Sequence, residues 1–239
     1  MTTTTTTTVD RIRRSNARGE YTWNDLLKHN WNELHASVFN LETAVTAAVG
    51  RSDPPKGICY HWHCDNYERF MHTLQTSLKC PLVLTAANNH NMDCGRKLME
   101  HDTLPLRLSS SRVIPNVHLI GIGSNWSEAA QPVTIECSNN NNEARIQIFA
   151  AGSTDSGIPS SWFATSTRSG LVGLPPLISQ AAVEQALDVL KRQLAVPPQS
   201  SSSSSSSSSV VVVVRVLSIH WGPNWADASS TDSQRFRQL

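Results

Sequence analysis

The chain has 239 residues, 39% of them hydrophobic, and a formal net charge of +1, which together fit one large folded domain. A nearly neutral chain gives no electrostatic basis for binding nucleic acid or an anionic membrane surface. No apolar segment approaches the roughly 20 residues that a membrane-spanning helix requires, so we expect no membrane span.

Two segments of the chain have low complexity. Residues 2–8 are all threonine and residues 200–209 are all serine. Such segments bury too little apolar surface to offset the entropy that is lost on ordering. We therefore predict a disordered tail over residues 1–19 and a domain over residues 20–239, with a disordered serine-rich insertion at 196–209. The threonine run has neither the charged nor the apolar part of a secretory signal, so we expect none.

The five cysteines are odd in number and irregularly spaced. This does not match the paired pattern of a disulfide framework. Reduced thiols are typical of the cytoplasm, which is therefore the compartment that we expect.

Helical and strand patterns alternate along the domain. Apolar residues at helical spacing predict helices before Leu34, near residues 95–100, and from Ser179 to Leu194. They also predict a helix up to Leu78, for which Asp65 or Asn66 is the expected N-cap. Apolar runs predict strands at residues 37–41, 81–87, 117–120, 133–136, 144–150 and 210–219. The alternation predicts an α/β layered domain. Because the strands are almost wholly apolar, both faces of their sheets are expected to be covered.

Polar turns follow three of these strands. They are Asn40–Glu42, Asn88–His90 and Ser218–His220. Ligands of open α/β sheets collect beyond the carboxyl ends of the strands. We therefore predict that the three turns converge on one metal-type site.

The turn at Asn88–His90 has two interpretations. Asparagines in turns commonly bond the local backbone, and Asp93 can cap the helix that follows. In the second interpretation the Asn89 carbonyl oxygen is a metal ligand and His90 is a neighbouring acid or oxyanion stabiliser. The sequence alone leaves both open.

Glu42 and His220 also have two interpretations each. A carboxylate just past a buried strand is a hard metal ligand that can bridge two metals, but it can equally cap a helix or a loop. His220, where a strand gives way to a Gly-Pro turn, is either a metal ligand or a structural histidine with a hydrogen-bonded ring.

Other motifs argue against competing functions. Cys59, His61, His63 and Cys64 suggest a zinc site, but in an extended strand Cys64 lies on the opposite face from the other three, and no second paired cluster follows. The segment Gly121–Gly123 lacks the third glycine of a dinucleotide fingerprint. The chain contains neither a GxxxxGK[ST] phosphate loop nor a GxSxG nucleophile elbow.

A longer series of residues keeps its order from about Tyr21 to Leu239. It comprises Tyr21–Asp25, Asn40–Thr46, Lys56–Ile58, His63, Asn66, Ala87–His90, Asp93, Gly95, Gly121–Gly123, Glu128, Ala129, Pro132, Gly157–Pro159, Trp162 and Ser218–Trp225. In these residues the chain resembles the CapA-type capsule synthesis family, whose members are associated with poly-γ-glutamate biosynthesis. The Asn-Asn-His turn and the segment Ser218–Trp225 are the most specific parts of the resemblance.

The resemblance implies a calcineurin-like metallophosphoesterase fold, an α/β sandwich with α/β/β/α layers and two divalent metal ions at the strand ends. It implies that Glu42 is a bridging-type carboxylate ligand, Asn89 an amide ligand and His220 an imidazole ligand. It also implies that His90 assists the leaving group or stabilises charge. Two cations, whether Mn, Fe or Zn, would polarise a phosphoester substrate and supply hydroxide near neutral pH.

The chain departs from the family pattern at both ends. The family opens with a strand ending in Gly-Asp, whose aspartate binds metal, and closes with a Gly-His-x-x-His turn. This chain contains no Gly-Asp dipeptide, and none of the 19 residues after His220 is a histidine. We therefore expect a partial domain, truncated at both ends, with an incomplete set of metal ligands. The expected functions are a metal-dependent hydrolase, a non-catalytic relative that binds a polyanionic polymer or a protein, or a truncated product without activity.

Overall fold

The computed structural model describes residues 31, 33–107, 114, 116–139, 142–196 and 212–222. The predicted tail at residues 1–19 lies outside the described residues. So do residues 197–209 of the predicted insertion and the first residues of the predicted last strand. Among the described residues no helix is both long enough and apolar enough to cross a membrane.

The first sheet is parallel and has the strand order β1 (Ser37–Asn40), β4 (Leu82–Thr85) and β5 (Val117–Ile120). The register pairs Asn40 with Thr85 and Thr85 with Ile120, so the three carboxyl ends lie level with one another. All four residues of β4 are buried, as expected for the middle strand of a covered sheet.

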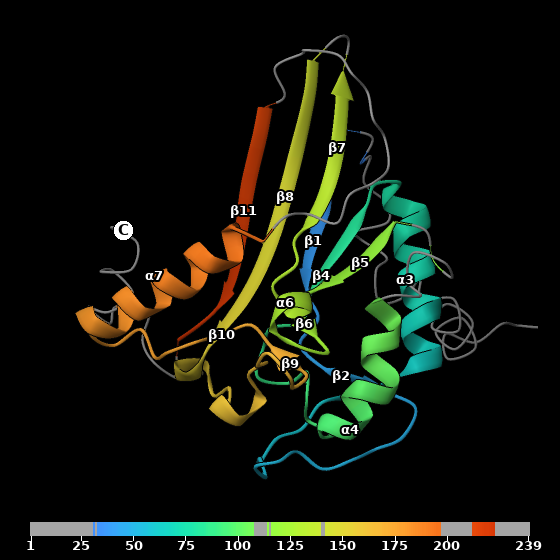
Figure 1. The fold of residues 1–239 in the computed structure, drawn as a ribbon. Coiled ribbons are helices and arrows are strands. Elements are labelled where there is room, and N and C mark those ends of the chain that lie inside the picture. Colours follow the sequence, from blue (N-terminus) through green and yellow to red (C-terminus); the bar gives the residue numbers. More distant parts are fainter. Residues whose placement is uncertain are drawn as a thin grey trace, which may run out of the picture.

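The second sheet is built around the long strand β8 (Asn142–Ser153) (Figure 1). Strand β7 (Val133–Asn139) pairs with it antiparallel, whereas β10 (Gly173–Leu174) and β11 (Val212–His220) pair with it parallel. The register of β11 runs without a break from Val212 opposite Ala144 to His220 opposite Gly152. The sheet therefore brings His220 to the level of the carboxyl end of β8.

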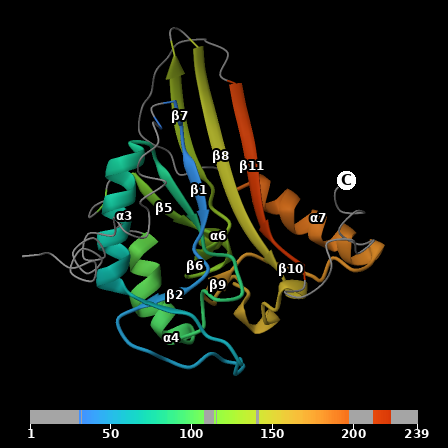
Figure 2. The ribbon, with the colours of Figure 1, turned by 180° about the vertical axis from the view of Figure 1, so that it is seen from behind.

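Two long helices cover the outer faces of the two sheets (Figures 1 and 2). Helix α3 (Cys64–Leu78) shares one buried cluster with Leu82 and Leu84 of the first sheet. Helix α7 (Gln180–Leu194) shares another with Ala151 and Leu174 of the second sheet. A third cluster, which contains Val83 and Ile148, lies between the sheets. The described elements thus form a mixed α/β structure in the layer order helix, sheet, sheet, helix.

Helix α3 begins earlier than its sequence pattern predicts. Its N-cap is His63, whose side chain accepts a hydrogen bond from the backbone nitrogen of Asp65. The prediction of Asp65 or Asn66 as the cap is therefore wrong by two or three residues. Its predicted apolar face is confirmed by four buried residues: Tyr67, Met71, Leu74 and Leu78.

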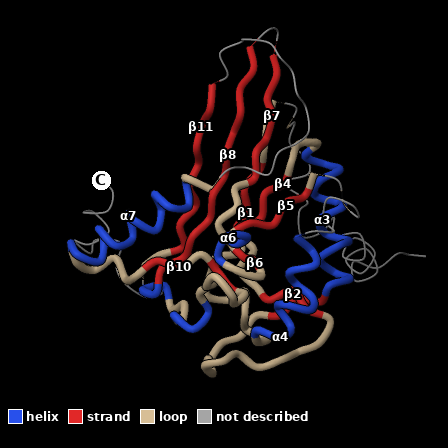
Figure 3. The backbone as a smooth tube through the Cα atoms, in the orientation of Figure 1, coloured by secondary structure: helices blue, strands red, loops and turns tan. Residues whose placement is uncertain are grey.

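Short elements gather near the carboxyl ends of the long strands (Figure 3). Strands β2 (Ala44–Thr46) and β3 (His61–His63) are parallel, and β6 (Ile122–Gly123) and β9 (Gly170–Leu171) are antiparallel. The helical segments are α4 (Arg96–Leu98), which continues as the π-helical segment Met99–Thr103, α6 (Trp126–Ala129), and the 3₁₀ turns Thr154–Ser156 and Ser160–Trp162. The sequence patterns predicted α4 but none of the short strands.

Glycines allow close packing at two places in this region. A Cβ on Gly152 would lie 2.4 Å from the carbonyl oxygen of Ala87, so the second sheet can approach the turn after β4 only without a side chain there. A Cβ on Gly123 would lie 2.3 Å from the backbone nitrogen of Ala129. The Gly121–Gly123 segment is thus explained by packing, with no nucleotide required.

Candidate functional site

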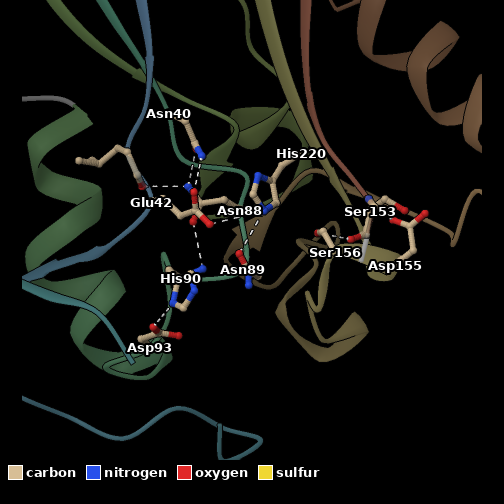
Figure 4. Close-up of polar contacts among 12 residues, drawn as sticks. Asn40, Glu42, Asn88, Asn89, His90, Asp93, Ser153, Asp155, Ser156 and His220 are labelled. Carbon is tan, nitrogen blue, oxygen red and sulfur yellow. Dashed lines mark hydrogen bonds and ion pairs between the residues drawn. The ribbon is translucent and has the colours of Figure 1, made fainter. Parts of the chain in front are cut away.

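Asn88 joins the carboxyl ends of β1 and β4 (Figure 4). Its side chain is buried, and Nδ2 donates to Asn40 Oδ1 at 3.0 Å and to the Leu41 carbonyl oxygen at 2.8 Å. Its Oδ1 accepts from the backbone nitrogen of His90 at 3.0 Å. The interpretation of Asn88 as a turn residue that bonds the local backbone is therefore confirmed. The same side chain also links the turn after β1 to the turn after β4.

Glu42 extends from the turn after β1 toward solvent. Its side chain is 42% exposed, and Oε2 accepts from Asn40 Nδ2 at 3.0 Å. The other oxygen, Oε1, lies 3.9 Å from Nε2 of His220. The carboxylate is therefore held by one amide and faces the imidazole with its second oxygen.

His220 lies at the carboxyl end of β11, with Nε2 3.0 Å from Oδ1 of Asn89. Asp155 lies on the opposite side of this histidine from Glu42 (Figure 4). Burial lowers the pKa of His220 below its usual value, and His90 acts in the same direction, whereas Glu42 and Asp155 oppose this shift. The imidazole is therefore held in its neutral form at neutral pH.

His90 is fixed by a buried carboxylate. Its Nδ1 lies 2.5 Å from Oδ2 of Asp93, whose side chain is fully buried. Because an ionised carboxylate only accepts, Nδ1 carries the proton and donates it. The Tyr60 ring stacks on the imidazole with centroids 4.1 Å apart. This arrangement leaves Nε2 of His90 as the nitrogen that can act on a bound molecule.

The proposed capping role of Asp93 is wrong. Helix α4 has Gly95 as its N-cap and receives no side-chain cap bond. Asp93 instead accepts from His90, from the backbone nitrogen of Tyr60 at 2.7 Å and from Nζ of Lys56 at 2.7 Å. Asp93 lies three residues after His90 in the sequence, a spacing that does not distinguish a partner of the imidazole from a helix cap.

The structure thus brings together the four residues singled out in the sequence: Glu42, Asn89, His90 and His220. The predicted convergence of the three turns is confirmed. Their individual roles as ligands or acid remain predictions. Lys56 and Tyr60 also contact this site. Lys56 is one of the residues that carry the family resemblance, but neither residue was given a role, because no periodic pattern in the loop 47–60 indicates its position in space.

The donors that could hold a cation are few. Among the described residues no group of three or more histidine, cysteine, aspartate or glutamate side chains is arranged to hold a metal ion. The set at the strand ends instead combines one carboxylate, one imidazole and the amide oxygen of Asn89. At the Cys59–Cys64 segment, Nε2 of His61 bonds the Thr46 carbonyl oxygen at 3.0 Å and both cysteines are free thiols.

Comparisons with known proteins bear on this site. The model of a family described as "Bacterial capsule synthesis protein PGA_cap" matches residues 4–238. Proteins from two strains of Mycobacterium tuberculosis, each described as a probable polyglutamine synthesis accessory protein, are 26% identical over 199 residues. The match covers 83% of this chain and 44% of each relative. The chain therefore spans less than half of the length of the curated relatives that it matches.

Proposed function

The chain belongs to the bacterial capsule synthesis family PGA_cap, and we propose that its strand-end site binds a divalent cation and hydrolyses a phosphoester-type bond during the synthesis of a capsule polymer. The relatives described as polyglutamine synthesis accessory proteins support an accessory role in making a polyglutamate-type polymer. A calcineurin-like metallophosphoesterase fold is part of the proposal. The order of layers, with two sheets between two helices, supports it.

One observation carries the proposal: oxygen and nitrogen donors from three strand ends lie close enough together to bind the same cation. Protein ligands lie about 2.0–2.2 Å from a divalent metal such as zinc or magnesium. Two ligands at right angles around such an ion are therefore about 3 Å apart. The 3.0 Å between Asn89 Oδ1 and His220 Nε2 fits this right-angle geometry. The 3.9 Å between His220 Nε2 and Glu42 Oε1 is wider, and stays below the roughly 4.2 Å that separates ligands on opposite sides of such an ion.

The described residues fit one cation and not two. Glu42, Asn89 and His220 supply three donors, and the described residues contain no group of three or more histidine, cysteine, aspartate or glutamate side chains that could hold a second ion. The mixture of oxygen and nitrogen donors suits Mn, Fe and Zn alike. A bound divalent cation would supply Lewis-acid polarisation of a phosphoryl oxygen and make attack by water feasible near neutral pH.

The chain's own residues would prepare the site in three ways. His220 keeps a neutral ring because its pKa is lowered, so a nitrogen lone pair is available to a cation. Without a cation Nε2 carries the ring proton and donates it to Asn89 Oδ1. A cation would bind Nε2 in the other neutral tautomer, with the proton moved to Nδ1, and this hydrogen bond would then be replaced. His90, held through Nδ1 by Asp93, presents Nε2 to the leaving oxygen, to which an imidazolium would donate its proton.

A second function has its own support. The fit to a single cation favours a protein that binds a polyanionic polymer through that cation without cleaving it. Binding without hydrolysis and hydrolysis differ in turnover alone, so both predict that the cation is bound by the same three side chains.

The test is to purify the protein, measure bound Mn, Fe and Zn, and assay chelator-sensitive hydrolysis of bis(p-nitrophenyl) phosphate. We expect close to one metal per chain, and we expect Asn89→Ala and His220→Ala to reduce both metal content and hydrolysis. His72→Ala, an exposed histidine on α3, is the matched control and should change neither. Absence of stoichiometric metal would overturn the cation site, and unchanged activity in both site variants would show that another site is responsible.

A further inference from the structure

The loop 47–60, between β2 and β3, contacts the Asn88–His90 turn through two residues. Lys56 donates from Nζ to the backbone carbonyl oxygen of Asn89 and to Asp93 Oδ1. Tyr60 donates its backbone N–H to Asp93 Oδ2 and stacks its ring on His90. The loop therefore touches both the backbone of the proposed amide ligand and the carboxylate that holds the imidazole.

Asp93 is the meeting point of these contacts. Its carboxylate is fully buried and accepts from Lys56, Tyr60 and His90, so each donor fixes the position of the other two. A buried carboxylate needs several donors, because burial without them costs several kcal/mol. Loss of one donor therefore leaves the carboxylate free to turn toward the others and move the imidazole with it.

Lys56 contacts the Asp93 carboxylate from the loop 47–60 and is not itself one of the proposed ligands. Its side chain is 17% exposed, and Nζ lies 5.3 Å from the centroid of the Trp162 ring. Nζ is also 3.4 Å from His90 Nδ1, but both atoms donate, so each bonds a different oxygen of Asp93. Among the contacts of Nζ in the described residues, none is to Glu42 or His220.

We propose that Lys56 is a positioning residue, which sets the orientation of the His90 ring and of the Asn89 amide through Asp93 and the Asn89 carbonyl. This inference rests on the proposed function for its catalytic consequence, although its structural content stands without it. The ammonium group joins the loop to the turn, because it donates both to the Asn89 carbonyl oxygen and to Asp93 Oδ1. A residue outside the site thereby determines where two groups inside it point.

The test compares Lys56→Met, which keeps the length of the side chain, with Lys56→Arg, which keeps the cation. Lys191→Met, an exposed lysine on α7, is the matched control. Long-range proton–nitrogen spectra of the histidine rings report the tautomer of His90. Titration with Mn²⁺ measures the affinity of the cation for the site that includes the Asn89 amide oxygen. Hydrolysis of bis(p-nitrophenyl) phosphate gives kcat and KM separately.

We expect Lys56→Met to remove the persistent Nδ1–H signal of His90, weaken Mn²⁺ binding and lower kcat by about tenfold or more with little change in KM, as loss of a residue that supports a site commonly does. Lys56→Arg should restore most of the signal. If Lys56→Met does not fold, Lys56→Gln, which keeps a donor for the Asn89 carbonyl, takes its place. An unchanged His90 signal in the variant would overturn the proposal. Absence of hydrolysis in the unaltered protein would overturn only the proposed function, because the spectra do not depend on activity.

Discussion

Asn89 and His220 are 131 residues apart in the sequence, yet Oδ1 of one lies 3.0 Å from Nε2 of the other. The contact joins the turn after β4, in the first sheet, to the end of β11, in the second. Because the two sheets are separate hydrogen-bonded units, their relative position depends on side-chain packing between them. The candidate site therefore lies where that packing brings the two sheets together.

Removal of the Glu42 charge should weaken cation binding without unfolding the protein. Glu42→Gln keeps the size of the side chain, and that side chain is 42% exposed. We expect the Kd for Mn²⁺ to rise by about tenfold or more, since a ligand that carries a full charge is replaced by a neutral amide. Isothermal titration checks this, with Glu184→Gln on α7 as the control for loss of an exposed carboxylate. Equal affinities in the two variants would exclude Glu42 as a ligand.

Asn88→Ala should destabilise the fold. The substitution removes three hydrogen bonds and leaves the Leu41 carbonyl oxygen and the His90 nitrogen without that partner in a buried place. We expect a loss of about 3 kcal/mol in the free energy of unfolding, measured by chemical denaturation. Asn66→Ala, on the first turn of α3, should cost under about 1 kcal/mol. A cost for Asn88→Ala as small as that of the control would contradict the role of Asn88 in joining the two turns.

Tyr67→Phe should leave stability unchanged or raise it. The Tyr67 hydroxyl is buried and has no hydrogen-bond partner among the described residues, and burial raises the pKa of Tyr67. Removal of an unsatisfied buried hydroxyl is expected to add up to about 1 kcal/mol to the free energy of unfolding. Thermal and chemical denaturation measure the change. Tyr60→Phe, at a residue that is 48% exposed, serves as the comparison and should have little effect. A marked loss of stability in Tyr67→Phe would reveal a partner for the hydroxyl.

Stability should fall as the solution becomes acidic, in part through His118. Burial lowers the pKa of His118 below the usual histidine value of about 6.5. The unfolded chain therefore binds a proton that the folded chain does not, in the range from about pH 6.5 down to the lowered pKa. The contribution is fully present above that range and is lost as the pH falls through it. Its slope is at most about 1.4 kcal/mol per pH unit for one proton.

Denaturation curves of the unaltered protein and of His118→Asn between pH 7.5 and pH 5, a range set by the usual histidine pKa of about 6.5, measure this contribution. The variant should show a shallower decline than the unaltered protein. Parallel declines in the two proteins would mean that His118 does not titrate on unfolding in this range.

The sequence predicted the parts of the fold that repeat a pattern over several residues. Helices α3 and α7 follow from apolar spacing because burial of one face requires it. Strands β4 and β5 follow from continuous apolar runs because both faces of their sheet are covered. Strands of two or three residues, such as β6 and β9, leave no such period. Their pairing depends on where the long elements place them, which is a property of the whole fold.

The candidate site shows the same division. The three turns could be predicted because the carboxyl ends of parallel strands in α/β sheets collect polar residues. Lys56 could not be placed, since a loop residue's position depends on contacts with distant parts of the chain, here the turn at Asn89 and the ring of Trp162. A helix cap was one of the interpretations left open for Asp93, because local spacing cannot distinguish a cap from a buried partner of His90.

The unbroken register between β11 and β8 has a consequence for how related sequences can differ. Side chains of a strand alternate between its two faces, so a shift of one residue in the pairing would turn His220 away from Asn89. Replacement of one valine by another β-branched residue between Val212 and Val216 preserves the pairing. Insertion or deletion of a single residue does not. Among descendants of this gene that keep the site, changes of length should therefore accumulate before β11 begins and be absent from the nine positions of the strand itself.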